Sequence, residues 1–500
     1  MNWHDPLQSR PIPPGAPLLL PQSVRALERT AQANGHTGLM QRAGEAATRL
    51  ARAVAPHARR VWVACGPGNN GGDGFELARA LHEAGLQVQV SALPTDSRPA
   101  DAARALAQAQ AAGLSVEAQA DAAWLSTLGP QDLCIDALLG IGASRPLQGP
   151  MAEWIERMNA LPALTLSLDA PTGLDGRSGQ SLSDPPVVVR ADHTLCFLAA
   201  QPGLWMGRGR DVCGQLWWAP LVTDEPSCPV DAWLNQEPTD RPRLHAGHKG
   251  LYGDVVVMGG ESWSHRGLGM QGASVLAAQA ALHAGAGRVM LCMEDALGPM
   301  PALPPELMLR RLEALNLERT TVVAGCGGGE QITRHMPALL SRSDRLVLDA
   351  DGLNAVACDP ALHALLRARA QRQGPQSTVL TPHPLEAARL LGLGTAQVQA
   401  DRLGAARALA QDWCCTVILK GSGSVIASPQ APCVVNPTGH GRLSVGGTGD
   451  VLAGLVGARL AQGWGAHDAA CAAAWQHGAL AQNWPPLQAL TASRLARALH

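Results

Sequence analysis

The stretch VWVACGPGNNGGDGFELARALHEAGLQVQV occupies residues 61–90 and decides the fold class. Its opening run VWVAC is apolar and stops at glycine, residues 75–85 place apolar side chains on one helical face, and LQVQV alternates with period two. Strand, glycine-rich turn, helix and strand in this order predict a βαβ unit, which requires a parallel sheet. We therefore expect an α/β protein.

The same alternation of strand and helix continues on both sides of a proline-rich segment. We expect a long helix over 23–54, capped by Ser23, and a helix over 271–284. Residues 223–240 combine prolines with polar residues and little periodicity, which is typical of a linker. The sequence thus predicts domains at 1–222 and 241–500. Further strands are expected at 132–140, 164–173, 193–200, 254–260, 288–293, 321–325, 345–354, 377–384 and 416–426.

Composition and charge argue against several classes of partner. Lys and Arg number 39 and Asp and Glu 41, so the formal net charge is −2, which gives no attraction for nucleic acid or an anionic membrane. The most apolar run, 274–293, is interrupted by polar residues, and the opening MNWHDPLQSR does not resemble a secretory signal. The 12 cysteines are scattered without a CxxC pair, so we expect a protein of the reducing cytoplasm.

The glycine-rich segment 65–81 is the first candidate site. Five glycines and the asparagines Asn69 and Asn70, placed between a strand and a helix, would let the backbone approach a ligand and present free N–H groups to an anion. The segment is neither a dinucleotide fingerprint nor a P-loop. Spacing alone indicates a phosphate or nucleotide ligand, with Asp73 at the helix start. The alternative is a tight turn that needs positive φ angles.

Two aspartates at predicted strand ends form the second candidate site. Asp136 and Asp169 could join Asn70 and the Thr172 hydroxyl as oxygen ligands of a hard cation, or one could act as a carboxylate base. Helix capping or loop hydrogen bonds are the alternative.

The segment SVGGTGDVLAGLVG (444–457) is the third, because glycine N–H groups at a helix start favour an anion. Asp450 in this setting is placed to remove a proton from a hydroxyl. Its alternative role is to stabilise the helix start.

Two further residues stand at predicted strand ends. His383 lies between two prolines in TPHPLEAARLLG (381–392), which fixes it in a stiff turn, and it is equally suited to contact a ligand or to serve the fold. Lys420 in LKGSGS (419–424) could meet a nucleotide phosphate as a point charge, although a lysine there can simply be solvated.

Taken together, these motifs resemble the bifunctional NAD(P)H-hydrate repair enzymes, in which a YjeF-type epimerase is fused to a dehydratase. The resemblance extends over residues 24–492. It rests in the first half on LMQRAG (39–44), CGPGNNGGDG (65–74), DALLGIG (136–142), LDAPTGLDG (168–176), ADHTLCF (191–197) and GRDVCGQL (209–216). In the second half it rests on HKGLYGDVVVMGG (248–260), ALHAGAGRV (281–289), DADGLN (349–354), TPHPLEAARLLG, LKGSGS and GGTGDVLAG (446–454).

The resemblance implies a Rossmann-like, three-layer epimerase domain with a parallel sheet, and a ribokinase-like α/β dehydratase domain. The epimerase would interconvert the R and S hydrates of NADH and NADPH, and the dehydratase would remove water from the S form at the expense of ADP, with Mg²⁺ as a candidate companion. Asp169 would be the acid/base of the epimerase, and Asn70, Asp136 and Thr172 would bind potassium. The hydrate would contact Asn69, Asn70, Gly71, Gly72, Asp73, Gly140, Ile141, Gly142, Ala143, Ser144, Arg145, Pro146 and Asp169.

In the dehydratase, the resemblance implies that Asp450 is catalytic. The hydrate would also contact Ala273, Gly327 and His383. The nucleotide would contact Lys420, Gly421, Ser422, Gly423, Ser424 and Gly449. We expect small-molecule substrates, a homo-oligomer, and neither nucleic acid nor membrane as a partner.

The sequence departs from the family pattern at several places. Thr172 stands where serine is usual and keeps the hydroxyl, Gln201 replaces a lysine, and Cys326 replaces a proline. His440, Gly441 and Arg442 replace the common Asn, Pro and Gly. Two other functions stay open: a ribokinase-like small-molecule kinase, and a first domain that acts only as an interaction module. Retention of Asp73, Asp136 and Asp169 together favours a working site.

Overall fold

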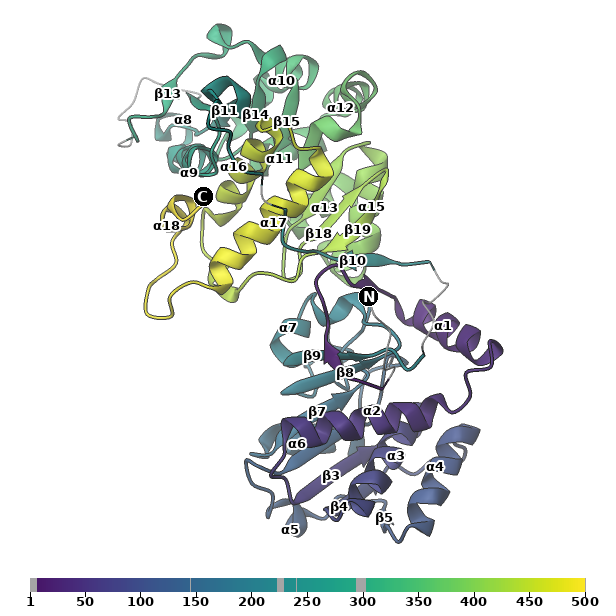
Figure 1. Ribbon diagram of the computed structural model, residues 1–500. Coiled ribbons are helices and arrows are strands. Elements are labelled where there is room, and N and C mark those ends of the chain that lie inside the picture. The colour runs from purple at the N-terminus through teal and green to yellow at the C-terminus, as the bar shows by residue number, and fades with distance from the viewer. Residues whose placement is uncertain (1–6, 144, 223–228, 240, 294–302, 500) are drawn as a thin grey trace. The chain divides into compact units, whose positions relative to one another are not determined.

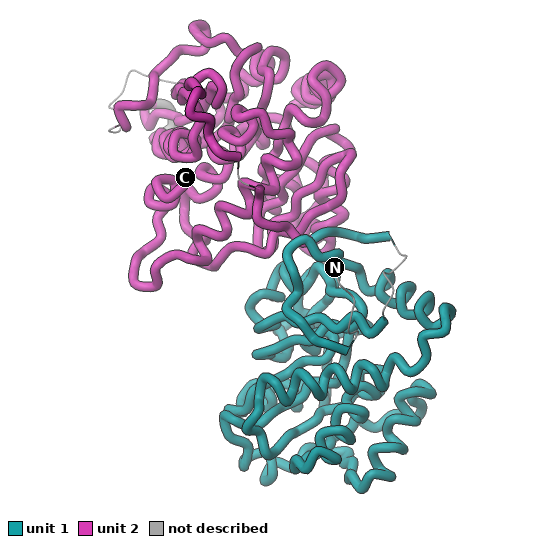
Figure 2. Tube along the Cα trace, viewed as in Figure 1, with its two compact units in different colours: residues 1–233 teal, residues 234–500 magenta. Residues whose placement is uncertain are grey.

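The computed structural model describes residues 7–143, 145–222, 229–239, 241–293 and 303–499. The chain divides into two units, Met1–Trp233 and Leu234–His500 (Figure 2). The division falls inside the short strand β10 (Ala232–Leu234). Residues 223–228 and 240 of the expected linker lie outside the described residues.

The first unit is built on a sheet in the order β1-β9-β8-β7-β6-β3-β4-β5 (Figure 1). The edge strand β1 is antiparallel to β9, and the other neighbours run parallel. The strands of this unit are β1 (Arg10–Pro11), β2 (Pro17–Leu18), β3 (Arg60–Cys65), β4 (Gln87–Ala92), β5 (Val116–Glu117), β6 (Leu133–Ala137), β7 (Leu164–Leu168), β8 (His193–Phe197) and β9 (Gln215–Ala219).

Helices cover both faces of this sheet because its strands are apolar on both sides. In β3, Val61 and Val63 belong to the core beneath α2, α3 and α4, whereas Trp62 and Ala64 belong to the core beneath α6. The expected three-layer parallel arrangement is confirmed. The helices are α1 (Pro21–Ala33), α2 (Leu39–Val54), α3 (Asn69–Glu83), α4 (Ala100–Ala111), α5 (Ala122–Leu125), α6 (Pro150–Ala160) and α7 (Gly209–Val212).

The single helix expected over 23–54 is wrong. The chain forms α1 and α2 instead, separated by glycines with positive φ: Gly35 at 87° and Gly38, which precedes α2, at 71°. Ser23 is not the cap either, because α1 begins at Pro21 after Leu20. Buried apolar residues recur at helical spacing on both sides of the break, at Val24, Leu27 and Ala31 and again at Leu39, Ala43 and Leu50, so spacing alone did not detect it.

The second unit carries strands in the order β13-β12-β11-β14-β15-β16-β17-β18-β19. Neighbours are parallel as far as β17. Strand β18 is antiparallel to both of its neighbours, β17 and β19. The α/β class expected for this half is confirmed. Its strands are β11 (Asp254–Gly259), β12 (Arg288–Met293), β13 (Met308–Leu309), β14 (Thr321–Ala324), β15 (Arg345–Leu348), β16 (Thr378–Leu380), β17 (Thr416–Leu419), β18 (Val425–Ser428) and β19 (Ala431–Val435).

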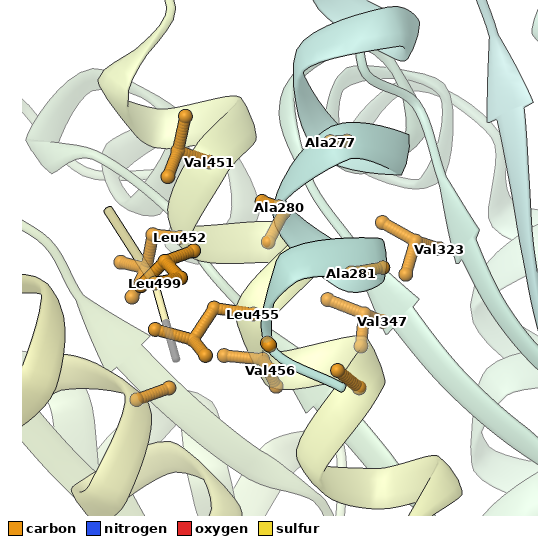
Figure 3. Close-up of a cluster of buried hydrophobic side chains, with 14 of the residues drawn as sticks. Ala277, Ala280, Ala281, Val323, Val347, Val451, Leu452, Leu455, Val456 and Leu499 are labelled. Atoms are coloured by element: carbon orange, nitrogen blue, oxygen red, sulfur yellow. The ribbon is translucent and has the colours of Figure 1, made fainter. Parts of the chain in front are cut away.

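Two almost wholly apolar helices, α9 and α16, lie together over one face of this sheet (Figure 3). Their buried alanines, leucines and valines contact Val323 and Val347 of the central strands. The helices of the unit are α8 (Trp263–Arg266), α9 (Gln271–His283), α10 (Met336–Arg342), α11 (Ala350–Cys358), α12 (Pro360–Gln373), α13 (Pro384–Leu391), α14 (Thr395–Ala400), α15 (Arg402–Asp412), α16 (Thr448–Ala461), α17 (Ala466–Gln482) and α18 (Ala492–Arg497). Within the described part of the chain, no helix is both long and apolar enough to cross a membrane.

The close approach of α9 to α16 gives a stability prediction. A Cβ at Gly454 would overlap the backbone of Ala277, whereas a Cβ at Gly272, also helical, meets nothing within 4 Å. We expect Gly454→Ala to cost about 1–3 kcal/mol through overpacking. The control Gly272→Ala should gain roughly 0.5–1 kcal/mol from helix propensity. Thermal unfolding of the two variants measures the difference, and a Gly454→Ala protein as stable as the parent would contradict this packing.

Candidate active sites

The first candidate site is a cavity of about 720 Å³ in the first unit. Its walls include the start of α3, the loop that follows β6, and Asp169 at the end of β7. Of the residues predicted to contact substrate, it is lined by Asn69, Asn70, Asp73, Gly140, Ile141, Gly142, Ala143 and Asp169. Gly71, Gly72, Arg145 and Pro146 are not lining residues, and Ser144 lies outside the described residues. The cavity thus gathers groups from separate strand ends, as expected of a parallel sheet.

The glycine-rich segment is the start of a helix. α3 begins at Asn69, so NNGGDG forms its first turns, and none of these glycines has a positive φ. A Cβ at Gly71 would overlap the carbonyl of Gly66, and a Cβ at Gly72 would lie 2.5 Å from the Met40 methyl carbon. The expected glycine-rich turn is therefore limited to residues 66–68, with Gly66 and Gly68, and the alternative that invoked positive φ is wrong. The glycines permit close packing, and the helix start still offers N–H groups to an anion.

Asp136 is a fully buried carboxyl held by neutral donors. It accepts hydrogen bonds from the Ser167 hydroxyl at 2.8 Å, from the Thr172 amide at 2.8 Å and hydroxyl at 2.6 Å, and from the Leu138 amide at 3.2 Å. Burial raises its pKa, and these hydrogen bonds offset part of that rise. Asp136 and Thr172 do not line the cavity, but Leu138 and Leu139, to which they are bonded, do.

The side chain of Asn70 shows whether this part of the cavity suits a cation. Its side chain is buried, it lines the cavity, and neither its amide oxygen nor its amide nitrogen has a hydrogen-bond partner. Buried polar atoms rarely stay unsatisfied unless a ligand, ion or water completes them. Asn70 shares the cavity wall with Leu138 and Leu139, whose amides donate to Asp136 and to the Thr172 hydroxyl. The oxygens of Asn70, Asp136 and Thr172 are ligand types that a hard cation takes.

Asp169 stands in an unusual backbone conformation, with φ of 68°. Its amide donates to the Leu195 carbonyl at 2.7 Å, and its Oδ2 accepts from the Ile141 amide at 2.9 Å. Burial raises its pKa to about 6. A Cβ at Gly140 would overlap this carboxyl, so glycine is needed where the loop passes it. Asp169 is therefore a fixed carboxyl that can give or take a proton near neutral pH.

Sequence reasoning missed one wall of this cavity. Val24, Arg25, Glu28 and Gln32 of α1 line it, together with His36 and Thr37 from the following turn. On an amphipathic surface helix such polar side chains are indistinguishable from solvated ones, so the sequence held no signal for them.

The second candidate site lies at strand ends of the second unit. The Lys420 Nζ is 2.6 Å from the Asp349 Oδ1, and a Cβ at Gly449 would lie 3.4 Å from this Nζ. Ligand atoms of Cys326, Asp349 and Asp450 all lie within 4.8 Å of one another. The structure therefore brings Lys420, Gly449 and Asp450 together as predicted. It adds Asp349, which the sequence analysis placed inside a predicted strand and at the start of the motif DADGLN without giving it a role.

The charges of this site are strongly coupled. Burial, followed by the charge of Asp349, raises the pKa of Asp450 to about 6. Burial alone would lower the pKa of Lys420, but the charges of Asp349 and Glu386 outweigh it and raise that pKa. Lys420 is therefore an ammonium group at neutral pH, beside a carboxyl that can accept a proton.

Two structural features fix the loops that carry Lys420 and Asp450. Gly447 has φ of 90° and precedes α16, whose first turn carries Gly449 and Asp450. Arg402, which sequence reasoning missed, donates to the carbonyls of Leu419 at 3.1 Å and Gly423 at 3.2 Å and so fixes the 420–424 loop. Arg402 is buried, and burial lowers its pKa to about 10.

His383 serves the fold directly. Its Nδ1 accepts from the amides of Leu385 at 3.1 Å and Glu386 at 3.2 Å, which caps α13, and its Nε2 lies 3.2 Å from Glu386. Burial, then the positive charge of Lys420, lowers its pKa, so the ring is neutral at pH 7. The remaining predicted substrate residues, Ala273 and Gly327, adjoin each other: a Cβ at Gly327 would lie 3.0 Å from the Ala273 Cβ.

Two departures from the family pattern have structural consequences. Cys326 is buried beside Asp349, with 4.0 Å between its Sγ and the Oδ2 of that residue, and burial raises the pKa of its thiol. Gln201 is buried, and neither atom of its amide group has a hydrogen-bond partner. Nothing in the structure explains Gln201.

The comparisons with known proteins match both units. The family model for the YjeF-related protein N-terminus matches residues 36–203, and that for NAD(P)H-hydrate dehydratase matches residues 255–499. The Escherichia coli (strain K12) protein named bifunctional NAD(P)H-hydrate repair enzyme Nnr is 35% identical over 465 residues, which cover 89% of this chain and 84% of that protein. The Coxiella burnetii protein of the same name is 33% identical over 484 residues, covering 92% of this chain and 93% of that protein.

A solved structure of an ADP/ATP-dependent NAD(P)H-hydrate dehydratase from Bacillus subtilis, co-crystallised with ATP and Mg²⁺, is 28% identical. The match covers 52% of this chain and 91% of the Bacillus subtilis chain, with a TM-score of 0.42. Two α/β units, each with a buried carboxyl at its own strand-end site, define a two-site α/β enzyme. The chain belongs to the family of bifunctional NAD(P)H-hydrate repair enzymes.

The Lys420–Asp349 pair gives a prediction that needs no substrate. Lys420→Met leaves a buried carboxylate without its cation, which should cost about 3–5 kcal/mol of stability. The double variant Lys420→Met/Asp349→Asn should regain much of that loss. Lys249→Met, at an exposed position, is the matched control. Chemical denaturation gives the free energy of unfolding of the parent and the three variants. A Lys420→Met protein as stable as Lys249→Met would show that the pair is not coupled in this way.

Proposed function

We propose that the chain repairs hydrated nicotinamide cofactors. The first unit epimerises the R and S hydrates of NADH and NADPH, and the second dehydrates the S epimer at the expense of ADP. The observation that carries this proposal is that each unit holds its own buried carboxyl, Asp169 or Asp450, with a pKa of about 6 inside a site that the family motifs mark. Relatives that match over both halves favour this two-activity enzyme over a lone kinase or a binding module.

In the epimerase, Asp169 exchanges a proton with the hydrate hydroxyl. That hydroxyl sits on a carbon next to the ring nitrogen, whose lone pair can expel it once it is protonated. The Ile141 amide keeps the Asp169 carboxyl in place, and the N–H groups at the start of α3 face the phosphates of the substrate. Asn70, Asp136 and Thr172 would hold a potassium ion, which would supply positive charge beside those phosphates. The unpartnered amide of Asn70 supports this assignment.

In the dehydratase, Asp450 removes the proton of the S hydrate hydroxyl, whose oxygen then accepts the terminal phosphoryl group of ADP. AMP leaves, and the C–O bond of the phosphate ester breaks as the ring nitrogen lone pair expels phosphate. The neighbouring carbon then loses a proton, which restores the reduced nicotinamide ring. Lys420 and the amide of Gly449 would balance the phosphoryl charge during transfer, and Mg²⁺ would accompany the nucleotide. The cytoplasmic location and the homo-oligomeric state expected from the sequence stay predictions.

The role of Asp450 predicts a pH profile and a variant. A base is active when ionised, so the dehydration rate at low substrate should fall as pH is lowered through about 6. Asp450→Asn should lower turnover by roughly 10²–10⁴-fold, because the amide cannot accept the proton. The variant should keep its ADP affinity, with little change, because the neutral amide does not repel phosphate as the carboxylate does. Turnover and ADP affinity are measured on the same protein.

The control for this variant is built into the chain. Epimerisation depends on the first unit, so Asp450→Asn should leave it unchanged, and retained ADP affinity shows that the second unit is folded. Near-normal dehydration by Asp450→Asn would remove Asp450 from the mechanism.

The cation site predicts that potassium supports epimerisation. Replacing potassium with a bulky organic cation should slow the epimerase, because a large cation cannot reach the oxygens of Asn70, Asp136 and Thr172. In an Asp136→Asn variant, the rate should lose its dependence on potassium. Epimerisation is followed by separating the two hydrates over time. A rate that is identical in the two salts would argue against the site.

A further inference from the structure

The cavity of the first unit has two walls of different origin. One wall is formed at the carboxyl ends of the strands and carries Asp169, after β7, and Asp73, in the first turns of α3. The other is α1, whose residues Val24 and Leu27 are buried against the core. Glu28 of this helix, half-buried, lines the cavity. Two carboxyl-bearing walls therefore enclose one space.

The carboxyls of the two walls interact through this space. The negative charge of Glu28 contributes to the raised pKa values of both Asp169 and Asp73, after the larger effect of burial. Burial also raises the pKa of Glu28, and Arg25 and Arg29 partly oppose that rise, while Asp101 adds to it. The cavity also carries the unpartnered, buried amide of Asn70, which indicates that a polar ligand completes it.

The chemistry assigned to the first unit requires a group on each face of the ring, an argument that rests on the proposed function. Inverting the hydroxyl-bearing carbon means that the C–O bond breaks on one face and a new one forms on the other. The departing oxygen needs a proton donor, and the arriving water needs a proton acceptor on the opposite side. A single carboxyl on one wall can serve only the face it touches.

We propose that Glu28 is the second acid–base group of the epimerase and acts on the ring face opposite Asp169. In one direction, the Asp169 carboxyl gives its proton to the hydroxyl, the ring nitrogen lone pair expels water, and a cationic ring remains. A water molecule on the α1 side then bonds to the same carbon and gives a proton to the Glu28 carboxylate. The product is the other epimer. Each proton taken from one carboxyl is returned to the other, and the reverse reaction exchanges their roles.

Glu28 suits this task better than Asp73. Asp73 belongs to α3, which starts after β3 at the same carboxyl ends of the strands as Asp169. Both carboxyls would therefore approach the ring from that wall. Glu28 is the glutamate of the α1 wall. The charges that act on it are those of Arg25 and Arg29 from its own helix and Asp101 from α4, and its charge in turn acts on Asp73 and Asp169, which line the same cavity.

The test measures inversion and oxygen exchange separately, in oxygen-18-labelled water without ADP. Glu28→Gln should slow inversion by roughly 10²–10⁴-fold. The epimer whose hydroxyl faces Asp169 should still lose that hydroxyl and regain labelled water on the same face. It should therefore take up label without inverting, while the other epimer should not exchange. Asp169→Asn should show the mirror pattern.

Three controls make the result decisive. Glu45→Gln changes an exposed glutamate on α2 that pairs with Arg49 and should behave as the parent protein. Dehydration of the S hydrate with ADP, measured on Glu28→Gln, should be unchanged, which shows that the second unit is intact. The retained oxygen exchange of one epimer shows that the first unit of this variant is folded. Inversion by Glu28→Gln within about tenfold of the parent, or equal loss of exchange for both epimers, overturns the role of Glu28. A parent protein that does not invert the hydrates overturns the proposed function itself.

Discussion

Carboxylates buried at the carboxyl ends of parallel strands are the constraint on which both sites depend. Removing a carboxylate from water is costly unless donors or cations replace the water. Asp136 meets this requirement with amides and hydroxyls, Asp169 with the Ile141 amide, and Asp349 with Lys420. Each solution fixes the loop that supplies the donor, so the geometry of the sites follows from the need to satisfy these groups.

The two sites use the same architecture but compensate their buried carboxyls differently. In the first unit, the nearest compensation for Asp136 and Asp169 comes from neutral donors, so the cavity collects negative charge and burial raises the pKa values. In the second unit, Lys420 provides a positive charge beside Asp349 and Asp450. The first arrangement suits proton exchange and a bound cation, whereas the second suits a transferring phosphoryl group. A family that performs both reactions therefore needs two units.

The sequence predicted β3, β7, β11, β14 and β15 because each of these apolar runs stops at a glycine or an aspartate. The single strand expected over 416–426 is wrong: β17 and β18 are two antiparallel strands separated by the 420–424 loop, and β9 and β19 were not predicted. The sequence also identified Asp169, Lys420 and Asp450, since those residues stand at strand ends or at a glycine-rich helix start. It failed where apolar residues keep a helical spacing on both sides of a helix break, as at Gly35 and Gly38, and where glycines serve packing, as at Gly72. Glu28 and Arg402 were missed because their partners come from distant segments, and only the folded chain shows what they face.

The central claim is that one chain divides repair between two sites with different selectivity. The most direct test incubates the purified protein with each separated hydrate in turn, with and without ADP, and follows the absorbance of the reduced nicotinamide. The account predicts recovery of the S hydrate only when ADP is present, and recovery of the R hydrate only through prior appearance of S. Recovery of both hydrates without ADP, or of R without any S intermediate, would contradict it.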